Sequence, residues 1–113
     1  MKVCIVAKGK GSLKDKIEKN FEKAKVFTII DSETDQIVTI QQIKKVFSDS
    51  FDQAEFVSEL GVDSIICSEL DDNSLLYFCR NNIIVSTQAR GTVENAYNMW
   101  KNGELPLEHV SED

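Results

Sequence analysis

Several features are scarce or missing in this 113-residue sequence, and each absence removes a class of protein. No apolar run approaches the roughly 18 residues of a membrane-spanning helix, and the first such run, VCIVA, is too short for the core of a signal peptide. The three cysteines, Cys4, Cys67 and Cys79, form no C-x-x-C pair. We therefore expect a cytoplasmic protein whose cysteines are free thiols in a reducing compartment.

Histidine is also scarce, which weakens every catalytic reading. The only histidine, His109, lies in the last ten residues, which are acidic and lack periodicity. A Cys–His or Ser–His pair would need that tail to dock on the domain, and no Cys/His cluster has the spacing of a zinc site. Carboxylates gather at Glu69, Asp71 and Asp72, where capping of a helix and its dipole explain them. We expect a protein that is not an enzyme.

The chain carries an excess of negative charge, and its charged residues are unevenly distributed. Residues 1–25 contain eight lysines and three acidic residues, a net charge of +5, whereas residues 26–113 carry −11. The negative total argues against a nucleic-acid binder, whose affinity comes from neutralising many phosphates. The basic N-terminal segment, in contrast, is able to attract a small anion.

Periodicity predicts five strands and three helices. Short apolar or β-branched runs indicate strands at 1–7, 26–31, 36–43, 62–67 and 83–86, and the second and third form a hairpin around the polar turn 32–35. Residues 14–24 predict a loop with one turn of helix. The first long helix is expected to begin with a capping box of Ser50 and Gln53 and to stop at Gly61. The expected apolar faces of the three helices are Phe51, Ala54, Val57 and Leu60, then Leu75, Leu76 and Cys79, then Val93, Ala96, Tyr97 and Trp100.

The element order β-β-β-α-β-α-β-α defines an α/β fold. The second helix is expected to begin at a cap on Asp72 or Asn73 and to end at Arg80, and the third at a cap on Thr92. Right-handed crossovers place strands one, four and five parallel, and the hairpin extends the sheet antiparallel at one edge. We expect one domain over residues 1–105 and an acidic, flexible tail over 106–113.

Two activities that such an order would suit are excluded by missing residues. The loop AKGKGSLKDK, residues 7–16, follows the first strand as a phosphate cradle would. Counting from Gly9, however, places Lys14 where both the Walker motif and the dinucleotide fingerprint need a glycine. A nuclease of the ribonuclease H kind needs converging carboxylates, and the first strand carries none. We expect no bound nucleotide and no phosphodiester chemistry.

A candidate site remains at the carboxyl ends of the strands, where open α/β sheets bind ligands. Cys67 and the segments 7–11 and 87–91 should lie along this edge, and Gly9 and Gly11 should make the first of these segments mobile. The helix that begins at Thr92 would present free backbone N–H groups to an anion. A thiolate beside lysines would suit a metal–sulfur species, although free cysteine is often simply buried. The candidate cofactor-binding residues are Lys8, Lys10, Lys14, Cys67, Arg90, Gly91 and Thr92, with Cys67 as the metal ligand.

The motifs MKVCIVA, NFEKAKVFTIIDSETDQIVTI, ELGVDSIIC and NNIIVSTQARGTVENAYNMWKNGEL, taken in order, resemble the dinitrogenase iron–molybdenum cofactor biosynthesis family. That family includes NifX-type carriers and the C-terminal domain of NifB-type proteins. The resemblance implies a ribonuclease H-like sheet without nuclease carboxylates. It also implies a non-enzymatic protein that holds an anionic iron–sulfur or molybdenum–iron–sulfur cluster for transfer to another protein. The chain departs from the family at 21–24, which often reads Phe-Gly-Arg-Ala, and at 48–50, where a His-Gly pair is common.

Two hypotheses stay open at this point. The first is a carrier of an anionic metal–sulfur cofactor, acting as a monomer or weak homodimer with a donor or recipient protein as its partner. The alternative is a metal-free interaction or regulatory module that docks through its acidic face or through the edge strand 36–43.

Overall fold

The sheet has the strand order that the sequence predicts, with one strand added. The structure is a computed structural model that describes residues 1–44, 47 and 49–109. The described residues form a six-stranded sheet in the order β3-β2-β1-β4-β5-β6, in which β1, β4 and β5 are parallel and the β2–β3 hairpin is antiparallel. The elements are β1 (Lys2–Ala7), the 3-10 helix η1 (Phe21–Lys23), β2 (Val26–Asp31), β3 (Gln36–Gln42), α1 (Ser50–Ser58), β4 (Ser64–Ile66), α2 (Asp72–Arg80), β5 (Ile84–Ser86), α3 (Val93–Lys101) and β6 (Leu107–Glu108).

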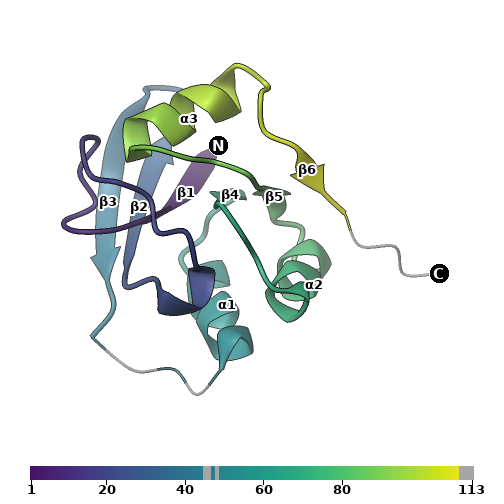
Figure 1. Ribbon diagram of the computed structural model, residues 1–113. Helices are drawn as coiled ribbons and strands as arrows, with labels where there is room; N and C mark the ends of the chain where they lie inside the picture. Colours follow the sequence, from purple (N-terminus) through teal and green to yellow (C-terminus); the bar gives the residue numbers. More distant parts are fainter. Residues whose placement is uncertain (45–46, 48, 110–113) are drawn as a thin grey trace.

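The two faces of the sheet are covered differently (Figure 1). Helices α1 and α2 pack together against one face, where Phe21, Phe27 and Phe78 are buried in the larger core cluster. The ring of Phe21 meets the ring of Phe78 edge-on at 5.7 Å between centroids. Helix α3 covers the other face over β1 and β4. The alternating and continuous apolar runs of the strands therefore supply both cores.

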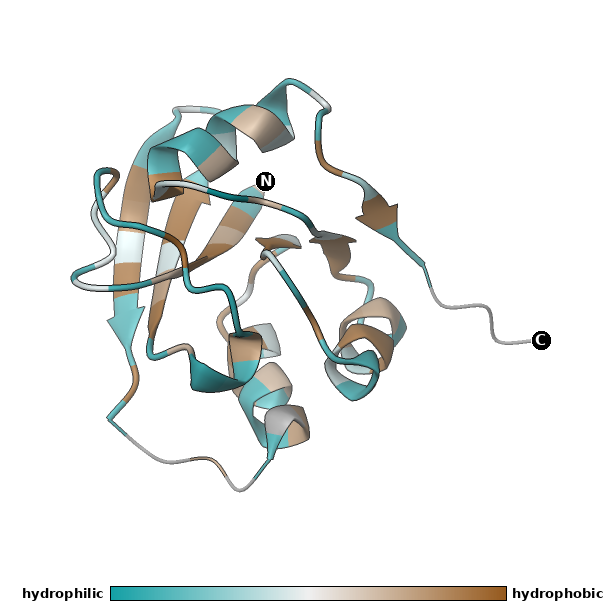
Figure 2. Ribbon diagram, in the orientation of Figure 1, coloured by the Kyte–Doolittle hydropathy of each residue, from teal (hydrophilic) through white to brown (hydrophobic). Residues whose placement is uncertain are grey.

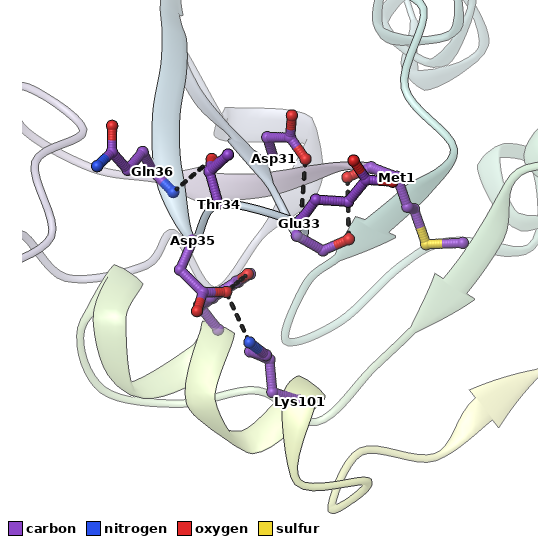
Figure 3. Close-up of polar contacts among 9 residues, drawn as sticks. Met1, Asp31, Glu33, Thr34, Asp35, Gln36 and Lys101 are labelled. Atoms are coloured by element: carbon purple, nitrogen blue, oxygen red, sulfur yellow. Dashed lines mark hydrogen bonds and ion pairs between the residues drawn. The ribbon is translucent and has the colours of Figure 1, made fainter.

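The tip of the β2–β3 hairpin is held to α3 by polar contacts (Figure 3). Asp35 Oδ1 accepts hydrogen bonds from the Tyr97 hydroxyl at 2.5 Å and from Lys101 Nζ at 2.6 Å. The Lys101 hydrogen bond, followed by that of Tyr97, holds the pKa of the Asp35 carboxyl below its usual range. Desolvation, followed by the bond to Asp35, raises the pKa of Tyr97. These contacts tie the tip of the hairpin to α3, which itself lies over β1 and β4.

A sixth strand, which the sequence did not predict, lies within the segment 106–113. It is β6, which pairs antiparallel with β5, and Thr87 Oγ1 donates to Glu108 Oε1 at 2.7 Å. The expected flexibility of this tail stays a prediction. Thr87 N also donates to the carbonyl of Pro106 at 3.2 Å. A strand of two residues is too short to show a period in the sequence, so no local signal marked it. Residues 110–113 lie outside the described residues.

The helix caps needed correction at two of three positions. Helix α1 is capped by Asp49, not Ser50, and Gln53 does not form a capping box: its buried Nε2 donates to the carbonyls of Phe21 and Ala24. Ser48, in the predicted 48–50 segment, lies outside the described residues. Helix α2 is capped by Asp71, whereas Thr92 caps α3 as predicted. None of the helices in the described residues has the length and apolarity needed to cross a membrane.

The expected apolar faces were right for α3 and only partly right for the other helices. Ala54 and Val57 of α1 are buried, but Phe51 is 46% exposed. In α2 the fully buried side chains are Ser74 and Phe78. The residues expected there, Leu75, Leu76 and Cys79, are half-buried.

Candidate functional site

Three loops meet at the carboxyl ends of the parallel strands, as the sequence predicts. They follow β1 (residues 8–20), β4 (67–71) and β5 (87–92). Cys67 N donates to the carbonyl of Ser86 at 3.0 Å, Ala89 N donates to the carbonyl of Cys67 at 3.2 Å, and Ile17 N donates to the carbonyl of Gly91 at 3.0 Å. The backbone thus places Cys67, the Arg90–Gly91 turn and the basic loop in a row.

The basic loop is held in one conformation by Asp15. Its Oδ2 accepts hydrogen bonds from Lys10 N at 3.1 Å, from Ser12 N at 3.0 Å and from Ser12 Oγ at 3.0 Å. The Ser12 backbone and side-chain bonds, and then the Lys10 contacts, hold the pKa of the Asp15 carboxyl below its usual range. Sequence reasoning missed this role, although the Ser-x-x-Asp spacing from 12 to 15 carried the signal for a local side-chain-to-backbone turn.

Gly11 anchors the same loop to the sheet. Its carbonyl accepts a hydrogen bond from Thr28 Oγ1 at 2.7 Å. Its φ is +74°, and an added Cβ would lie 2.7 Å from Thr28 Oγ1 and 2.8 Å from side-chain carbons of Val26 and Ile40. Here glycine permits close packing against β2 and β3. The packing of Gly11 fixes one point of the loop on the sheet, and the expected mobility of the loop stays a prediction.

The N-terminus of α3 is closed by that loop. Val93 N donates to the carbonyl of Asp15 at 2.8 Å and Glu94 N to the carbonyl of Leu13 at 3.0 Å, while Asn95 N donates to Thr92 Oγ1 at 3.1 Å. The prediction that this helix presents free N–H groups to an anion is wrong, because these donors already have partners within the chain. Nothing local in the sequence indicated that two carbonyls eighty residues earlier in the chain would take them.

The crevice between β1 and β4 is also filled by the chain itself. Lys8 N donates to the carbonyl of Lys16 at 2.8 Å, and Glu18 N donates to the carbonyl of Val6 at 3.0 Å. Asn20 then forms an isolated parallel β-bridge with Glu69. Residues 16–20 thus cross the strand ends at the place where ligands of open α/β sheets usually bind.

The predicted cationic residues lie on the outside of this closed edge. Lys8 pairs with Glu18 at 3.8 Å. Lys10, Lys14 and Arg90 are exposed and, among the described residues, form no salt bridge. The carbonyl of Arg90 accepts a hydrogen bond from Asn95 Nδ2 at 2.7 Å, which fixes the turn that carries its guanidinium. The side chains that would meet an anion are therefore available at the surface.

The thiol of Cys67 is buried on the α1–α2 side of the sheet. Its Sγ lies 3.7 Å from the carbonyl of Ser86, to which it donates a weak hydrogen bond. Desolvation, followed by the charge of Glu108, raises the pKa of Cys67 to about 12. Across the described part of the chain, no three histidine, cysteine or acidic residues are placed to hold a metal ion. The donor set is thus not a preformed metal centre, and the ligand role of Cys67 stays a prediction.

The surface near Cys67 is acidic. A pocket of about 250 Å³ between η1 and the β4 loop is lined by Glu22, Glu69 and Asp71. A second, of about 270 Å³, is lined by Glu69, Asp72 and Glu108. Loops that follow different strands thus give the carboxyl edge a basic side, at the loop after β1, and an acidic side, at the loop after β4.

Fold and site together define a small α/β domain with a mixed sheet, closed strand ends and exposed cations beside them. The family described as dinitrogenase iron-molybdenum cofactor matches residues 1–103, and the chain belongs to that family. No curated protein matches the sequence.

Solved structures share the fold at low sequence identity. The apo form of the orange protein from Desulfovibrio gigas aligns with a TM-score of 0.84 and 17% identity, over 95% of this chain and 92% of that one. A putative NifB protein from Thermotoga aligns with a TM-score of 0.78 and 21% identity, over 99% and 98% of the two chains. A putative dinitrogenase from Methanocaldococcus jannaschii has a TM-score of 0.66 and 24% identity, over 98% and 97%.

Proposed function

We propose that this protein is a small non-enzymatic carrier that holds an anionic iron–sulfur or iron–molybdenum-type cluster during metallocluster biosynthesis and passes it to another protein. Family membership over residues 1–103 supports the class of cargo. The observation that carries the proposal is the set of exposed cations Lys10, Lys14 and Arg90, which form no salt bridge with the described residues and lie on turns that Asp15 and Asn95 hold in place.

Binding at such a surface suits a transfer protein. Surface cations attract an anion through charge and release it when a competing partner offers better ligands, because exposed charge interactions are weak and screened by salt. Nucleotides are not expected here, since the donors at the start of α3 already have partners. Cys67 would contribute only after its thiol left the carbonyl of Ser86 and lost its proton.

The test is anaerobic reconstitution with iron and sulfide, read by visible absorption and by iron and sulfide per chain. The double substitution Lys10→Glu with Lys14→Glu should abolish cluster retention. The matched control, Lys23→Glu with Lys25→Glu, makes the same change in net charge at two other exposed lysines and should retain the cluster. Equal loss in the two double variants would show that only net charge matters, and would overturn the site.

A separate variant, Cys67→Ser, tests the role of the cysteine in the same experiment. Cys67→Ser should lower the iron content if the thiol ligates the metal after a local opening. Unchanged iron content in Cys67→Ser, with loss in the lysine variant, would remove Cys67 from the site and leave a purely electrostatic one. Unchanged iron content in all of these variants would exclude both Cys67 and the lysines from the site.

A second candidate function is favoured by one observation, the outer edge of β3, with which no other described strand pairs. That strand ends the sheet, and Val38 is 52% exposed on it. An extended segment of another protein is able to pair with such an edge. Anaerobically purified protein with no metal, and a partner whose retention is lost in Val38→Lys, would favour this metal-free module over the carrier.

A further inference from the structure

A pocket of about 610 Å³ lies on the face of the sheet beyond α3, away from the closed carboxyl edge. It is bounded by β4 and β5, by the end of α3 and by β6 with the connection that leads to it. Its size is within the range of sites for small organic molecules. Its lining includes Ser64, Ile84, Ser86, Trp100, Leu105 and Leu107.

The rim of this pocket is unusually apolar for a surface. Five large hydrophobic side chains are exposed among the described residues, and three of them line this pocket: Met1 at 45%, Ile84 at 44% and Leu107 at 55%. Figure 2 shows hydrophobic colour in β5 and at the start of β6. Clustered exposure of this kind marks a binding surface more often than scattered single residues do.

A hydroxyl group without a partner lies among the residues that line it. Ser64 and Ser86 sit on neighbouring strands, and both are fully buried. Ser64 Oγ donates to the carbonyl of Ile84 at 3.0 Å, whereas Ser86 Oγ has no hydrogen-bond partner. Because Ser86 and Ile84 are two residues apart on β5, their side chains lie on the same face of the sheet. Buried hydroxyls are nearly always satisfied, so the Ser86 hydroxyl is an unused hydrogen-bonding group in the wall of the pocket, just below its surface.

We propose that this pocket binds a small, uncharged, amphipathic organic molecule. Its apolar body would pack against Trp100, Ile84 and Leu107, and a single hydroxyl or carbonyl group would hydrogen-bond with Ser86 Oγ. An uncharged ligand suits this lining because Lys101, the one charged side chain among the described lining residues, is already paired with Asp35 at 2.6 Å. The α-ammonium group of Met1 is the other charge of the lining residues, and Met1 lies at the exposed rim. The proposal is independent of cluster binding, since it uses none of the cationic loop residues.

The experiment is an NMR titration with phenol and with toluene, which carries a methyl group in place of the hydroxyl. Trp100 is the only tryptophan, so its indole N–H signal reports directly on the pocket. Both probes should shift that signal in the wild-type protein. In Ser86→Ala the affinity for phenol relative to toluene should fall about fivefold, which corresponds to the loss of one ordinary hydrogen bond.

A variant at the rim and a matched variant far from the pocket provide the control for location. Ile84→Glu places a charge at the mouth of the pocket and should abolish the binding of both probes. Val38→Glu makes the same change at a similarly exposed strand position, on the opposite edge of the sheet, and should leave both affinities unchanged. Dispersed amide spectra and unchanged melting temperatures verify that the variants are folded.

Three outcomes would overturn the proposal. The first is the absence of a shift at Trp100 with millimolar phenol or toluene. The second is an unchanged phenol-to-toluene ratio in folded Ser86→Ala. The third is a wild-type dimer in sedimentation that Ile84→Glu converts to a monomer, which would assign this face to a contact between two copies of the chain instead.

Discussion

The carboxyl edge of the sheet and the face beside β6 differ in the opposite way from what topology predicts. The carboxyl edge is closed, and the face beside β6 contains a pocket. Ligands of open α/β sheets bind where the parallel strands end, but here residues 16–20 cross those ends and the carbonyls of Leu13 and Asp15 take the first N–H groups of α3. The face next to β6, which topology does not mark, contains a pocket of about 610 Å³. Topology predicts which loops meet, and the packing of those loops decides whether room for a ligand remains.

The largest expected effect tests how closed the carboxyl edge is. Burial raises the pKa of Cys67 to about 12, so far less of its thiol is ionised at neutral pH than in an ordinary cysteine. Cys67 should therefore react with iodoacetamide far more slowly than half-buried Cys79, as followed by peptide mass spectrometry. In urea the two should react alike. Equal rates in the native protein would mean that the edge opens readily, and the contrast with the β6 face would disappear.

The next effect tests how tightly the basic loop is packed on the sheet. Gly11→Ala should cost about 3 to 4 kcal/mol, because a left-handed conformation and a steric clash with Thr28, Val26 and Ile40 add together. Gly103→Ala is the matched control: its φ is +72°, and nothing lies within 4 Å of an added Cβ. It should cost only about 1 to 2 kcal/mol. If urea unfolding gave similar losses of stability for Gly11→Ala and Gly103→Ala, the loop would be able to accommodate the added methyl group, and it would not be tightly packed on the sheet.

The fold was predictable from the sequence where short-range patterns encode it, and not where distant segments meet. The hairpin, the parallel strands and the Thr92 cap were predicted because short-range patterns encode them. Gln53 looked like part of a capping box, but its amide reaches the carbonyls of Phe21 and Ala24, about thirty residues away. Such a partner is set by tertiary packing, so a local pattern is unable to reveal it.

The candidate site was predictable to the same extent. Its loops were placed on the correct edge from topology alone. What the sequence did not reveal was that Gly11 packs against Val26 and Ile40 and that the thiol of Cys67 lies buried against the carbonyl of Ser86. Both depend on how side chains fill space between segments distant in the chain, and both decide whether a residue is available to a ligand.

A third effect concerns the charge that holds the basic loop. Because hydrogen bonds from Ser12 and Lys10 hold the pKa of Asp15 below its usual range, its carboxylate stabilises the native state above pH of about 4. That stabilisation is lost as pH falls through the lowered pKa. Asp15→Asn should therefore lower the urea midpoint at pH 7, and the difference from wild type should shrink toward pH 2.

Ser12→Ala separates the charge from its partners in the same experiment. It keeps the carboxyl group and removes the hydroxyl donor at 3.0 Å, so its pH dependence should lie between those of wild type and Asp15→Asn. A constant difference between wild type and Asp15→Asn from pH 7 to pH 2 would show that the charge of Asp15 does not stabilise the loop.

The smallest effect compares two serines on the face beside β6. Ser64→Ala removes a hydroxyl bonded to the carbonyl of Ile84 and should cost about 1 kcal/mol in urea unfolding. Ser86→Ala removes an equally buried hydroxyl that has no partner, so it should leave stability unchanged or raise it by up to about 1 kcal/mol. Saturating phenol should then stabilise wild type more than Ser86→Ala, because a ligand stabilises most the native state that binds it more tightly. Equal destabilisation by the two substitutions without phenol would mean that Ser86 is already satisfied, and the pocket would lose the polar group that defines its ligand.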